Sequence, residues 1–247
     1  MKAVFIDIDG TIVNDSGEVS GRTADAVKRI KTLGYIPVVC TGRTISTARQ
    51  ICVDANCDHL IFANGGGIYD FAADKIIYEN PINPKSVVRL RDTVKHEKIS
   101  TVFVTDGLIK ETFVPGDKVV QMNLVSYDIK ALPGVRAHIE EFPDLKIANQ
   151  SKHFSNPSFH TENRYFFDVV CKNTSKGSGI VNFCKIFKLD KKDTIAIGDD
   201  MNDFAMFEEC GYRVAMGNAL PTLKKTADLV TDTNNNDGVA KFLETLT

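Results

Sequence analysis

The 247-residue sequence predicts an α/β fold in which a parallel-sheet core is interrupted by an inserted α+β domain. Near both ends of the chain, short apolar runs that finish in polar or glycine residues alternate with segments of helical periodicity. This alternation is typical of a parallel sheet with crossover helices. Between residues 83 and 172 the pattern changes to several partly alternating, strand-like runs. We therefore assign residues 1–82 and 173–247 to the core and 83–172 to the insert.

The first predicted strand, residues 3–6, is apolar throughout, as expected of a strand that is buried on both faces of a sheet. It runs directly into the segment Asp7-Ile8-Asp9-Gly10-Thr11. Acidic residues are unfavourable inside such a strand, but its carboxyl end borders the crevice in which open parallel sheets bind ligands. Taken alone, the segment is equally well explained as a polar turn without function.

Asp7 and Asp9 are two residues apart, so an extended backbone would project both side chains to the same side. Two carboxylates held that close repel each other and need a cation or a proton. Mg²⁺ prefers oxygen ligands and would satisfy them, leaving one carboxylate as a nucleophile and the other for proton transfer. Gly10 permits a sharp turn of the backbone, and Thr11 supplies a hydroxyl there.

Further strands and helices follow in alternation. A helix with Ser20 as its N-cap precedes the second strand, residues 36–40, which ends in Thr41-Gly42-Arg43. A helical pattern over residues 45–55 then leads to the third strand, residues 60–63. The asparagine and three glycines after this strand are weak evidence for a ligand site, because a tight turn explains them as well.

A predicted hairpin, residues 68–69 with 76–78, leads to two prolines that mark the start of the insert. Within the insert we expect helices over residues 86–98 and 134–141 and an exposed polar loop over 151–162. The strands expected in the insert are 101–105, 109–114, 119–127, 146–148 and 165–171. Because strands outnumber helices there, the insert reads as a separate α+β unit.

The α/β alternation returns after residue 172. The elements expected there are a helix over 177–187, a strand over 194–198, a helix over 204–209, a strand over 213–216, and shorter segments near 221, 229–230 and 239–246. The strand 194–198 ends in Asp199-Asp200-Met201-Asn202-Asp203, a second group of acids at a strand end. If this end neighbours that of the first strand, Asp7, Asp9 and Asp199 can surround one Mg²⁺ ion. A helix starting near Asn202 would direct its positive end toward a phosphate.

Four motifs in order make the sequence resemble the haloacid dehalogenase superfamily of phosphatases. The motifs are Asp7-Ile8-Asp9-Gly10-Thr11, Thr41-Gly42-Arg43, Lys176 followed by Gly177, and Gly198-Asp199-Asp200-Met201-Asn202-Asp203. An insert between the second and third motifs is similar to that of the Cof-type subgroup. The resemblance implies a Rossmann-like parallel-sheet core with an α+β cap that selects substrates, and within the cap it is only architectural. Asn64-Gly65-Gly66 departs from the Asn-Gly-Ala that relatives often have.

The resemblance also implies roles for the matching residues. Asp7 would attack phosphorus and carry an aspartyl-phosphate, and Asp9 would protonate the leaving oxygen and later deprotonate a water molecule. The protein ligands of Mg²⁺ would come from Asp7, Asp199 and Asp9, the last also through its backbone carbonyl. The groups that would hold the phosphate are Thr41, Gly42, Lys176 and Asn202.

Other residues of the motifs would support this site. Asp203 and Thr11 would contact its members, and for Asp203 a direct bond to the metal is the less favoured alternative. Asn202 is an alternative partner for Lys176. Arg43 stays open between a structural role at a helix start and a functional one. We expect Asp200 to be exposed and without a role.

Composition limits the classes to which the protein can belong. A hydrophobic share of 43% and a charged share of 25% are ordinary for a soluble globular protein, and the net charge of −2 argues against a nucleic-acid partner. Because the sequence shows no secretory signal and no apolar stretch long enough for a membrane span, we expect a cytoplasmic protein without a membrane partner. The six cysteines, none in a C-x-x-C pair, are expected to be buried free thiols. The sequence does not indicate an oligomeric state.

By analogy with such relatives, the expected partner is a small phosphorylated metabolite such as a sugar phosphate. Candidate cap contacts are Asn123, His153, His160 and Tyr165, although each is more simply explained as a surface or core residue of the cap. One alternative is a phosphotransferase or mutase that uses the same aspartyl-phosphate. Another is a non-catalytic phosphate-binding protein, such as a receiver domain, but a receiver's acceptor aspartate follows a middle strand rather than the first.

Overall fold

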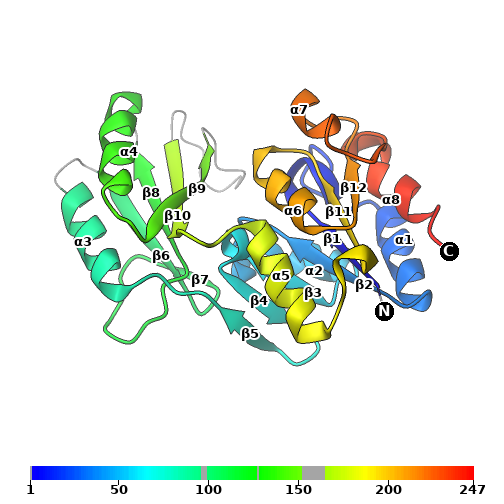
Figure 1. Ribbon diagram of the computed structural model, residues 1–247, viewed down its shortest axis with the longest axis horizontal. Helices are drawn as coiled ribbons and strands as arrows, with labels where there is room; N and C mark the ends of the chain where they lie inside the picture. Colours follow the sequence, from blue (N-terminus) through cyan, green and yellow to red (C-terminus); the bar gives the residue numbers. More distant parts are fainter. Residues whose placement is uncertain (1, 96–98, 127, 152–164) are drawn as a thin grey trace. The chain divides into compact units, whose positions relative to one another are not determined.

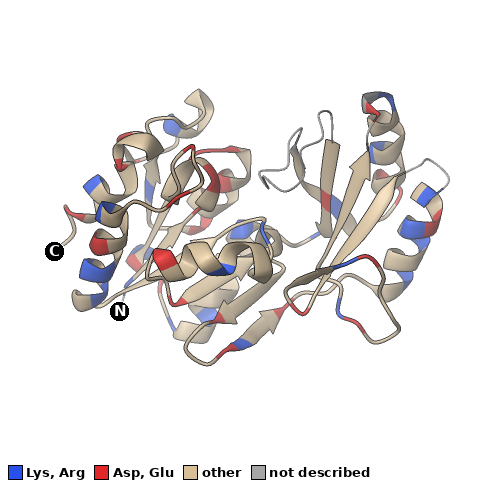
Figure 2. Ribbon diagram, turned by 180° about the vertical axis from the view of Figure 1, so that it is seen from behind, with Lys and Arg blue, Asp and Glu red and all other residues tan. Residues whose placement is uncertain are grey.

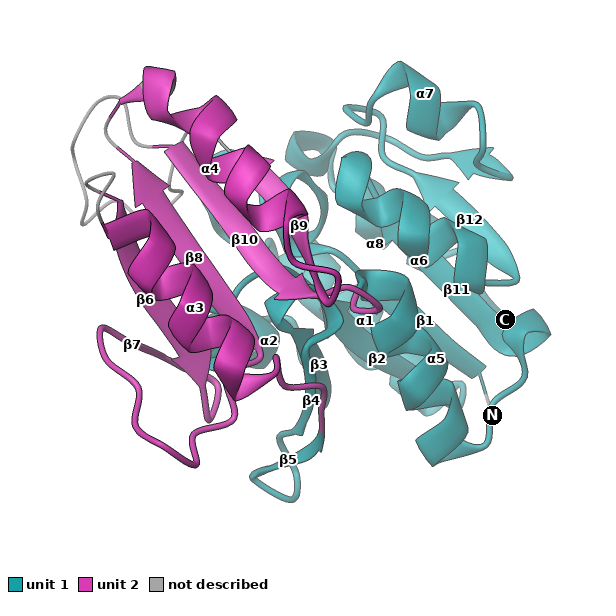
Figure 3. Ribbon diagram, turned by 60° about the vertical axis from the view of Figure 1, so that its left-hand side comes forward, with its two compact units in different colours: residues 1–78, 175–247 teal, residues 79–174 magenta. Residues whose placement is uncertain are grey.

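The computed structural model describes residues 2–95, 99–126, 128–151 and 165–247 (Figure 1). The chain forms two compact units, the first made of residues 1–78 and 175–247 and the second of residues 79–174 (Figure 3). The first unit has a largely parallel sheet with helices and the second an antiparallel sheet with helices, so the predicted fold class is confirmed. The units meet in sequence at 78/79 and 174/175, and their separate functions remain a prediction.

The first unit is built on an eight-stranded sheet in the order β13-β12-β11-β1-β2-β3-β4-β5. Its strands are β1 (Lys2–Ile6), β2 (Tyr35–Cys40), β3 (His59–Phe62), β4 (Gly67–Asp70), β5 (Lys75–Glu79), β11 (Thr194–Gly198), β12 (Tyr212–Ala215) and β13 (Leu229–Val230). The strands from β13 to β3 run parallel, whereas β4 pairs antiparallel with β3. The carboxyl ends of β2, β1, β11 and β12 therefore meet at one edge of the sheet.

Helices cover both faces of this sheet. They are α1 (Gly21–Thr32), α2 (Ile45–Asp54), α5 (Lys176–Phe187), α6 (Phe204–Glu209), α7 (Pro221–Lys224) and α8 (Gly238–Leu243). α5 packs against α6 and α1 against α8, and the two pairs lie on opposite faces (Figure 3). Ser20 caps α1 as predicted, since its side chain accepts a hydrogen bond from the backbone of Thr23. β1 is buried on both sides: Val4, Phe5 and Ile6 have no exposed surface.

The second unit has a five-stranded antiparallel sheet in the order β7-β6-β8-β10-β9. Its strands are β6 (Ser100–Thr105), β7 (Leu108–Lys110), β8 (Gln121–Ser126), β9 (Leu145–Ser151) and β10 (Tyr165–Cys171). Its helices, α3 (Pro84–Lys95) and α4 (Leu132–Glu140), lie on one face of the sheet (Figures 1 and 3). They enclose an apolar core that includes Leu90, Val135, Phe103, Met122 and Phe167.

Some predicted bounds in the insert were wrong. The strand expected over 109–114 is β7, which ends at Lys110, because the chain then turns back on itself: the Val114 amide donates to the Asp117 carboxylate and the Asp117 amide to the Val114 carbonyl. β8 begins at Gln121 rather than 119, and β9 extends from 145 to 151 rather than 146 to 148. Most of the predicted loop 151–162 lies outside the described residues.

Two predictions from composition are tested directly. All six cysteines are free thiols, and four of them are buried. Within the described ranges, no helix combines the length and the apolar character needed to cross a membrane. Figure 2 shows basic and acidic positions interspersed along the helices of each unit.

Candidate active site

The acidic and polar residues predicted at strand ends gather at one edge of the first unit's sheet. Asp7 follows β1, Thr41 follows β2, and Asp199 follows β11. Since β1 pairs in parallel with both β2 and β11, these three residues leave the sheet on the same side. This is the edge at which open parallel sheets bind ligands.

The chain turns sharply after β1 instead of continuing as an extended strand. The Ile12 and Val13 amides donate to the Asp7 and Ile8 carbonyls at 3.2 and 3.3 Å. Gly10 lies in the left-handed region at φ 75°, and a Cβ at this position would collide with the Asp199 carboxylate. We call residues 8–13 the Asp9 turn. Because of this turn, Asp9 does not simply repeat the direction of Asp7, as an extended backbone had suggested.

Lys176 connects the two acidic motifs. It is the first residue of α5 and only 2% exposed, and its Nζ donates to Asp7 Oδ1 at 2.6 Å and to Asp203 Oδ1 at 2.7 Å. A third bond reaches Asn202 Oδ1 at 3.1 Å. The next residue must be small, because a Cβ on Gly177 would collide with the Ala205 carbonyl of α6. The close packing of α5 on α6 thus delivers the ammonium group to the strand edge.

Asp203 is completely buried and holds the second acidic loop in shape. Its Oδ2 accepts from the backbone amides of Asp199 at 2.8 Å and Asp200 at 3.1 Å, while its Oδ1 accepts from Lys176. Asp200 is exposed and accepts from the Met201 amide at 2.7 Å. Thr11 Oγ1 donates to Asp199 Oδ1 at 2.9 Å, so the Asp9 turn is tied directly to this loop.

The charges of this cluster do not balance. Burial raises the pKa of Asp7 well above its ordinary value, although Lys176 opposes the shift. Burial, followed by repulsion from Asp203, raises the pKa of Asp199 to about 7. Burial disfavours the Lys176 ammonium, but the carboxylates of Asp203 and Asp7 outweigh this effect and raise its pKa, so Lys176 stays charged. Several carboxylates therefore share a single ammonium.

The described residues fit a hard divalent cation. Asp7, Asp199 and Asp203 each offer an oxygen within 4.8 Å of the others. When all three are ionised, the Lys176 ammonium leaves two of their negative charges uncompensated, which is the charge of one Mg²⁺ ion. An all-oxygen donor set suits Mg²⁺, and a bound cation would lower the raised carboxyl pKa values. The carboxylate of Asp9 is outside this group, and a ligand role for its backbone carbonyl remains a prediction.

Asp9 is instead paired with Arg43, whose role the sequence left open. The Arg43 guanidinium donates to the two carboxylate oxygens of Asp9 at 2.5 and 3.0 Å, and half of the Asp9 side chain is exposed. The Arg43 amide in turn donates to Thr41 Oγ1 at 3.2 Å. This pair therefore links the second motif to the first at the rim of the site.

Thr41 and Gly42 are placed by backbone pairing rather than by their side chains. The Thr41 amide donates to the Ile61 carbonyl at 2.9 Å, and its own carbonyl accepts from the Asn64 amide at 3.0 Å. Gly42 faces the Asn64 side chain, which would lie only 3.0 Å from an added Cβ. The phosphate-binding roles of Thr41 and Gly42 remain predictions.

Sequence reasoning missed one residue at this edge. Asn218 follows β12 and donates through Nδ2 to the Gly10 carbonyl at 2.7 Å. The signal was available, since Asn218 stands in a polar turn after a short apolar strand, as Asp7 and Asp199 do. Of the candidate contacts in the insert, Asn123 donates to Asp168 at 2.6 Å. Tyr165 opens β10, and His153 and His160 lie outside the described residues.

Comparisons with known proteins relate the chain to one family. The model of the haloacid dehalogenase-like hydrolase family matches residues 4–123 and 110–243. Two proteins of Bacillus subtilis (strain 168) are named 5-amino-6-(5-phospho-D-ribitylamino)uracil phosphatase: YwtE, 24% identical over 282 residues (100% of this chain, 98% of YwtE), and YcsE, 28% identical over 248 residues (98% and 94%). A crystal structure of a haloacid dehalogenase-like hydrolase from Bacteroides thetaiotaomicron is 24% identical with a TM-score of 0.82, covering 98% of each chain, and shows the same fold.

Proposed function

The chain belongs to the haloacid dehalogenase-like hydrolases, and from this membership we propose that it is a Mg²⁺-dependent phosphatase that hydrolyses a small phosphomonoester through an aspartyl-phosphate on Asp7. The observation that carries the proposal is the buried contact of Lys176 Nζ with Asp7 and Asp203. A buried lysine held by carboxylates at a ligand-binding sheet edge is suited to neutralise a phosphoryl group.

The first half-reaction transfers the phosphoryl group to the enzyme. A carboxylate oxygen of Asp7 attacks phosphorus and forms a new P–O bond, while the P–O bond to the leaving alcohol breaks. Asp9 gives a proton to the departing oxygen, so the alcohol leaves neutral. Lys176 remains hydrogen-bonded beside Asp7 throughout and offsets the charge that gathers there.

The second half-reaction restores the enzyme. Asp9, now a carboxylate, takes a proton from a water molecule whose oxygen attacks phosphorus, and the P–O bond to Asp7 breaks. Inorganic phosphate leaves, and both carboxyl groups return to their starting states. Arg43 holds Asp9 by two hydrogen bonds, which fixes the carboxyl group at the rim where a leaving oxygen and a water can reach it.

Asp7 and Asp199, with the backbone carbonyl of Asp9, would hold the metal ion. When bound, Mg²⁺ would neutralise the phosphoryl oxygens and orient them for in-line attack. Asp203 already uses its oxygens for Lys176 and for two backbone amides, so we assign it to positioning rather than to metal binding.

For the substrate, we propose that the insert selects a hydroxylated leaving group such as a sugar or polyol. Asp168 lies directly opposite Asn123 on β8 and Asn149 on β9, so these side chains form one row across three strands. They alternate with Phe167 and Met122 of the apolar core, which places the row on the sheet face opposite to α3 and α4. A carboxylate flanked by carboxamides suits hydroxyl groups, and the YwtE and YcsE names specify a ribityl phosphate.

A phosphotransferase or mutase that uses the same intermediate remains the alternative. It differs in the acceptor, because the phosphoryl group would pass from Asp7 to a second hydroxyl rather than to water. Release of inorganic phosphate in water alone, compared with transfer to an added sugar, separates the two reactions.

The deciding experiment measures phosphate release from a panel of sugar, polyol and nucleotide phosphates, with Mg²⁺ and with chelator. Wild type is compared with Asp7→Asn and with Asp200→Asn, a matched change at an exposed acid of the same edge. We expect Mg²⁺-dependent release that Asp7→Asn abolishes and Asp200→Asn retains. Release by a folded Asp7→Asn protein would contradict the nucleophile assignment. Asn123→Leu should reduce kcat/KM for polyol phosphates roughly 3- to 10-fold, the effect of one hydrogen bond, and spare aryl phosphates.

A further inference from the structure

We propose that three asparagines from the C-terminal part of the chain, Asn218, Asn234 and Asn235, act as positioning residues that fix the Asp9 turn against Asp199. We call these three residues the carboxamide clasp. They lie about 200 residues from the turn in sequence. All of their contacts lie within the first unit.

Asn218 bridges the turn and the Asp199 carboxylate. Its Nδ2 donates to the Gly10 carbonyl at 2.7 Å and lies 3.5 Å from Asp199 Oδ2. Thr11 makes the matching bond to the other oxygen of Asp199. Hydrogen bonds therefore connect both oxygens of the Asp199 carboxylate to the Asp9 turn, one through Thr11 and one through Asn218.

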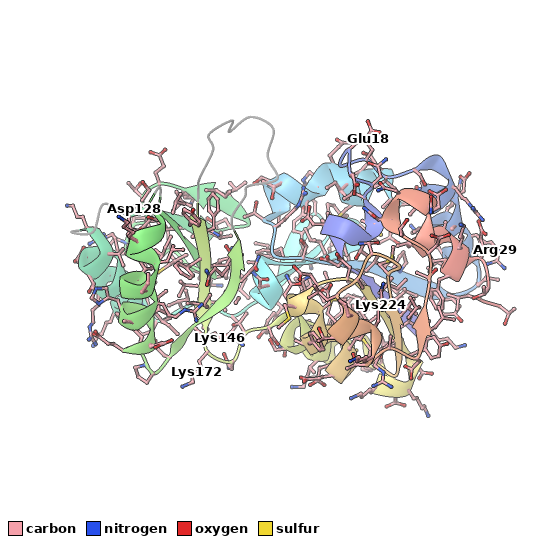
Figure 4. The ribbon with its side chains drawn as sticks, turned by 90° about the horizontal axis from the view of Figure 1, so that it is seen from above. Glu18, Arg29, Asp128, Lys146, Lys172 and Lys224 are labelled. Atoms are coloured by element: carbon pink, nitrogen blue, oxygen red, sulfur yellow. The ribbon has the colours of Figure 1, made fainter. Side chains whose placement is uncertain are left out.

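Asn218 is itself held by its surroundings. Its Oδ1 accepts from the Asn234 amide at 3.0 Å. The turn that carries it is fixed on both sides: the Gly217 amide donates to the Asp232 carbonyl at 2.9 Å, and the Leu220 amide donates to the Asp199 carbonyl at 2.9 Å. Lys224, labelled in Figure 4, donates from α7 to the Gly217 carbonyl. These bonds give the Asn218 amide a fixed direction toward Gly10.

Asn234 and Asn235 hold the exit of the turn. Asn234 Nδ2 donates to the Val13 carbonyl and to Asp15 Oδ1, each at 3.1 Å. Asn235 Nδ2 donates to Asp15 Oδ2 at 2.7 Å, and its Oδ1 accepts from the Asp15 amide at 3.0 Å. The clasp thus grips the turn at Gly10 and again just beyond Val13.

The turn needs this external support because its internal bonds are few. Two bonds close it, at 3.2 and 3.3 Å, and Gly10 gives it conformational freedom. Asp9 directly precedes Gly10, the first of the two points that the clasp holds. The consequence for catalysis rests on the proposed function, since a displaced turn would move the general acid and the metal-binding groups apart. Mutation of residues that orient the metal ligands without binding the metal typically lowers metal affinity or activity by roughly 10- to 100-fold.

The test compares Asn218→Ala and Asn234→Ala with Asn236→Ala. Asn236 belongs to the same run, but its amide donates to Asp232 Oδ1 at 3.1 Å rather than to the turn, which makes it a matched control. We expect the first two variants to lower kcat and Mg²⁺ affinity by about 10-fold with little change in KM, and the control to resemble wild type. Amide exchange at Ile12 and Val13 should accelerate about fivefold, the effect of one hydrogen bond.

Several outcomes would overturn the proposal. Wild-type exchange rates and Mg²⁺ affinity in Asn218→Ala would show that the turn does not depend on the clasp, and an equal effect of Asn236→Ala would reduce the result to general destabilisation. Asn234→Asp, which removes the Nδ2 donor but keeps nearly the same side-chain size, replaces the alanine variant if the latter does not fold. Exchange and Mg²⁺ titration need no turnover, so a wild type that releases no phosphate refutes the proposed function without deciding on the clasp.

Discussion

Replacing Asp203 by asparagine tests the central interaction of the site without changing its shape. The Asp203 carboxylate accepts on both oxygens, from Lys176 on one side and from the Asp199 and Asp200 amides on the other. An asparagine has one acceptor oxygen and one NH₂ group. In either orientation, therefore, the NH₂ donor must face another donor, so Asp203→Asn cannot satisfy both sides of this buried position.

The size of the effect follows from the bonds lost. Hydrogen bonds to charged groups contribute about 1.5–3 kcal/mol each, and removing one partner of a buried ion pair costs about 3–5 kcal/mol. Asp7 remains as a partner for Lys176, and one source of repulsion on Asp199 disappears, so we expect a loss near the lower end, about 3 kcal/mol. For a unit of this size, that loss corresponds to a melting temperature lower by about 6–12 °C.

The assay is thermal and urea unfolding of the metal-free protein in chelator, because bound Mg²⁺ would add its own stabilisation. Asp200→Asn is the control: Asp200 is exposed, accepts from the Met201 amide, and can be replaced by asparagine, which caps equally well. We expect the control to change the unfolding free energy by less than about 0.5 kcal/mol. If Asp203→Asn is no less stable than Asp200→Asn, the carboxylate does not hold Lys176 and the loop as described.

Gly10→Ala should destabilise the metal-free protein and weaken Mg²⁺ binding, whereas Gly17→Ala, at a nearly identical φ with open space around it, should show only the cost of the backbone angle, about 1 kcal/mol. Unfolding and Mg²⁺ titration separate the two, and equal losses would argue against a collision at position 10. Burial lowers the pKa of His59, so this group binds more protons in the unfolded chain below about pH 6.5 and makes stability fall as the pH drops from 7, whereas the raised pKa values of Asp7 and Asp199 in the metal-free protein act in the opposite direction. His59→Leu should remove only the His59 contribution, so in chelator its unfolding free energy should rise relative to that of wild type as the pH drops from 7 to 5 in urea titrations. A difference that does not change with pH would mean that His59 makes no such contribution. Arg43→Ala should lower kcat by about 10-fold, part of the contribution of a positioned acid, with the melting temperature within about 2 °C because its partner Asp9 is half exposed. A fall in stability without a fall in kcat would make Arg43 structural.

The sequence predicted the core and the positions of the site because polar residues at strand ends interrupt otherwise apolar runs. Asp7 and Asp199 were identified in this way, and their strands are adjacent. The direction of Asp9 was not predictable, because it depends on how the chain turns at Gly10 rather than on strand periodicity. The predicted bounds of strands in the insert were also imprecise. After Lys110, local hydrogen bonds between Val114 and Asp117 outweigh the β propensity of the sequence.

The carboxamide clasp could not be identified from the sequence for a different reason. Asn218 stands in a polar turn after a strand and Asn234 lies in a loop, but neither position indicates its partner, which is Gly10 or Val13, more than 200 positions away. No local pattern encodes such a contact; only the sheet order, which brings the ends of β1, β11 and β12 together, creates it.

Several charged side chains of the site occupy positions that are unfavourable for them, and this indicates what the site binds. Lys176 is the first residue of a helix, where the dipole disfavours a cation, and it is buried. Asp7 and Asp203 are buried among like charges. Each placement is unfavourable alone, and together with an ionised Asp199 they leave two negative charges uncompensated. Because a protein that only needed stability would fill this edge with apolar side chains at no such cost, the arrangement is better explained by a cation and an anionic phosphoryl group that complete it.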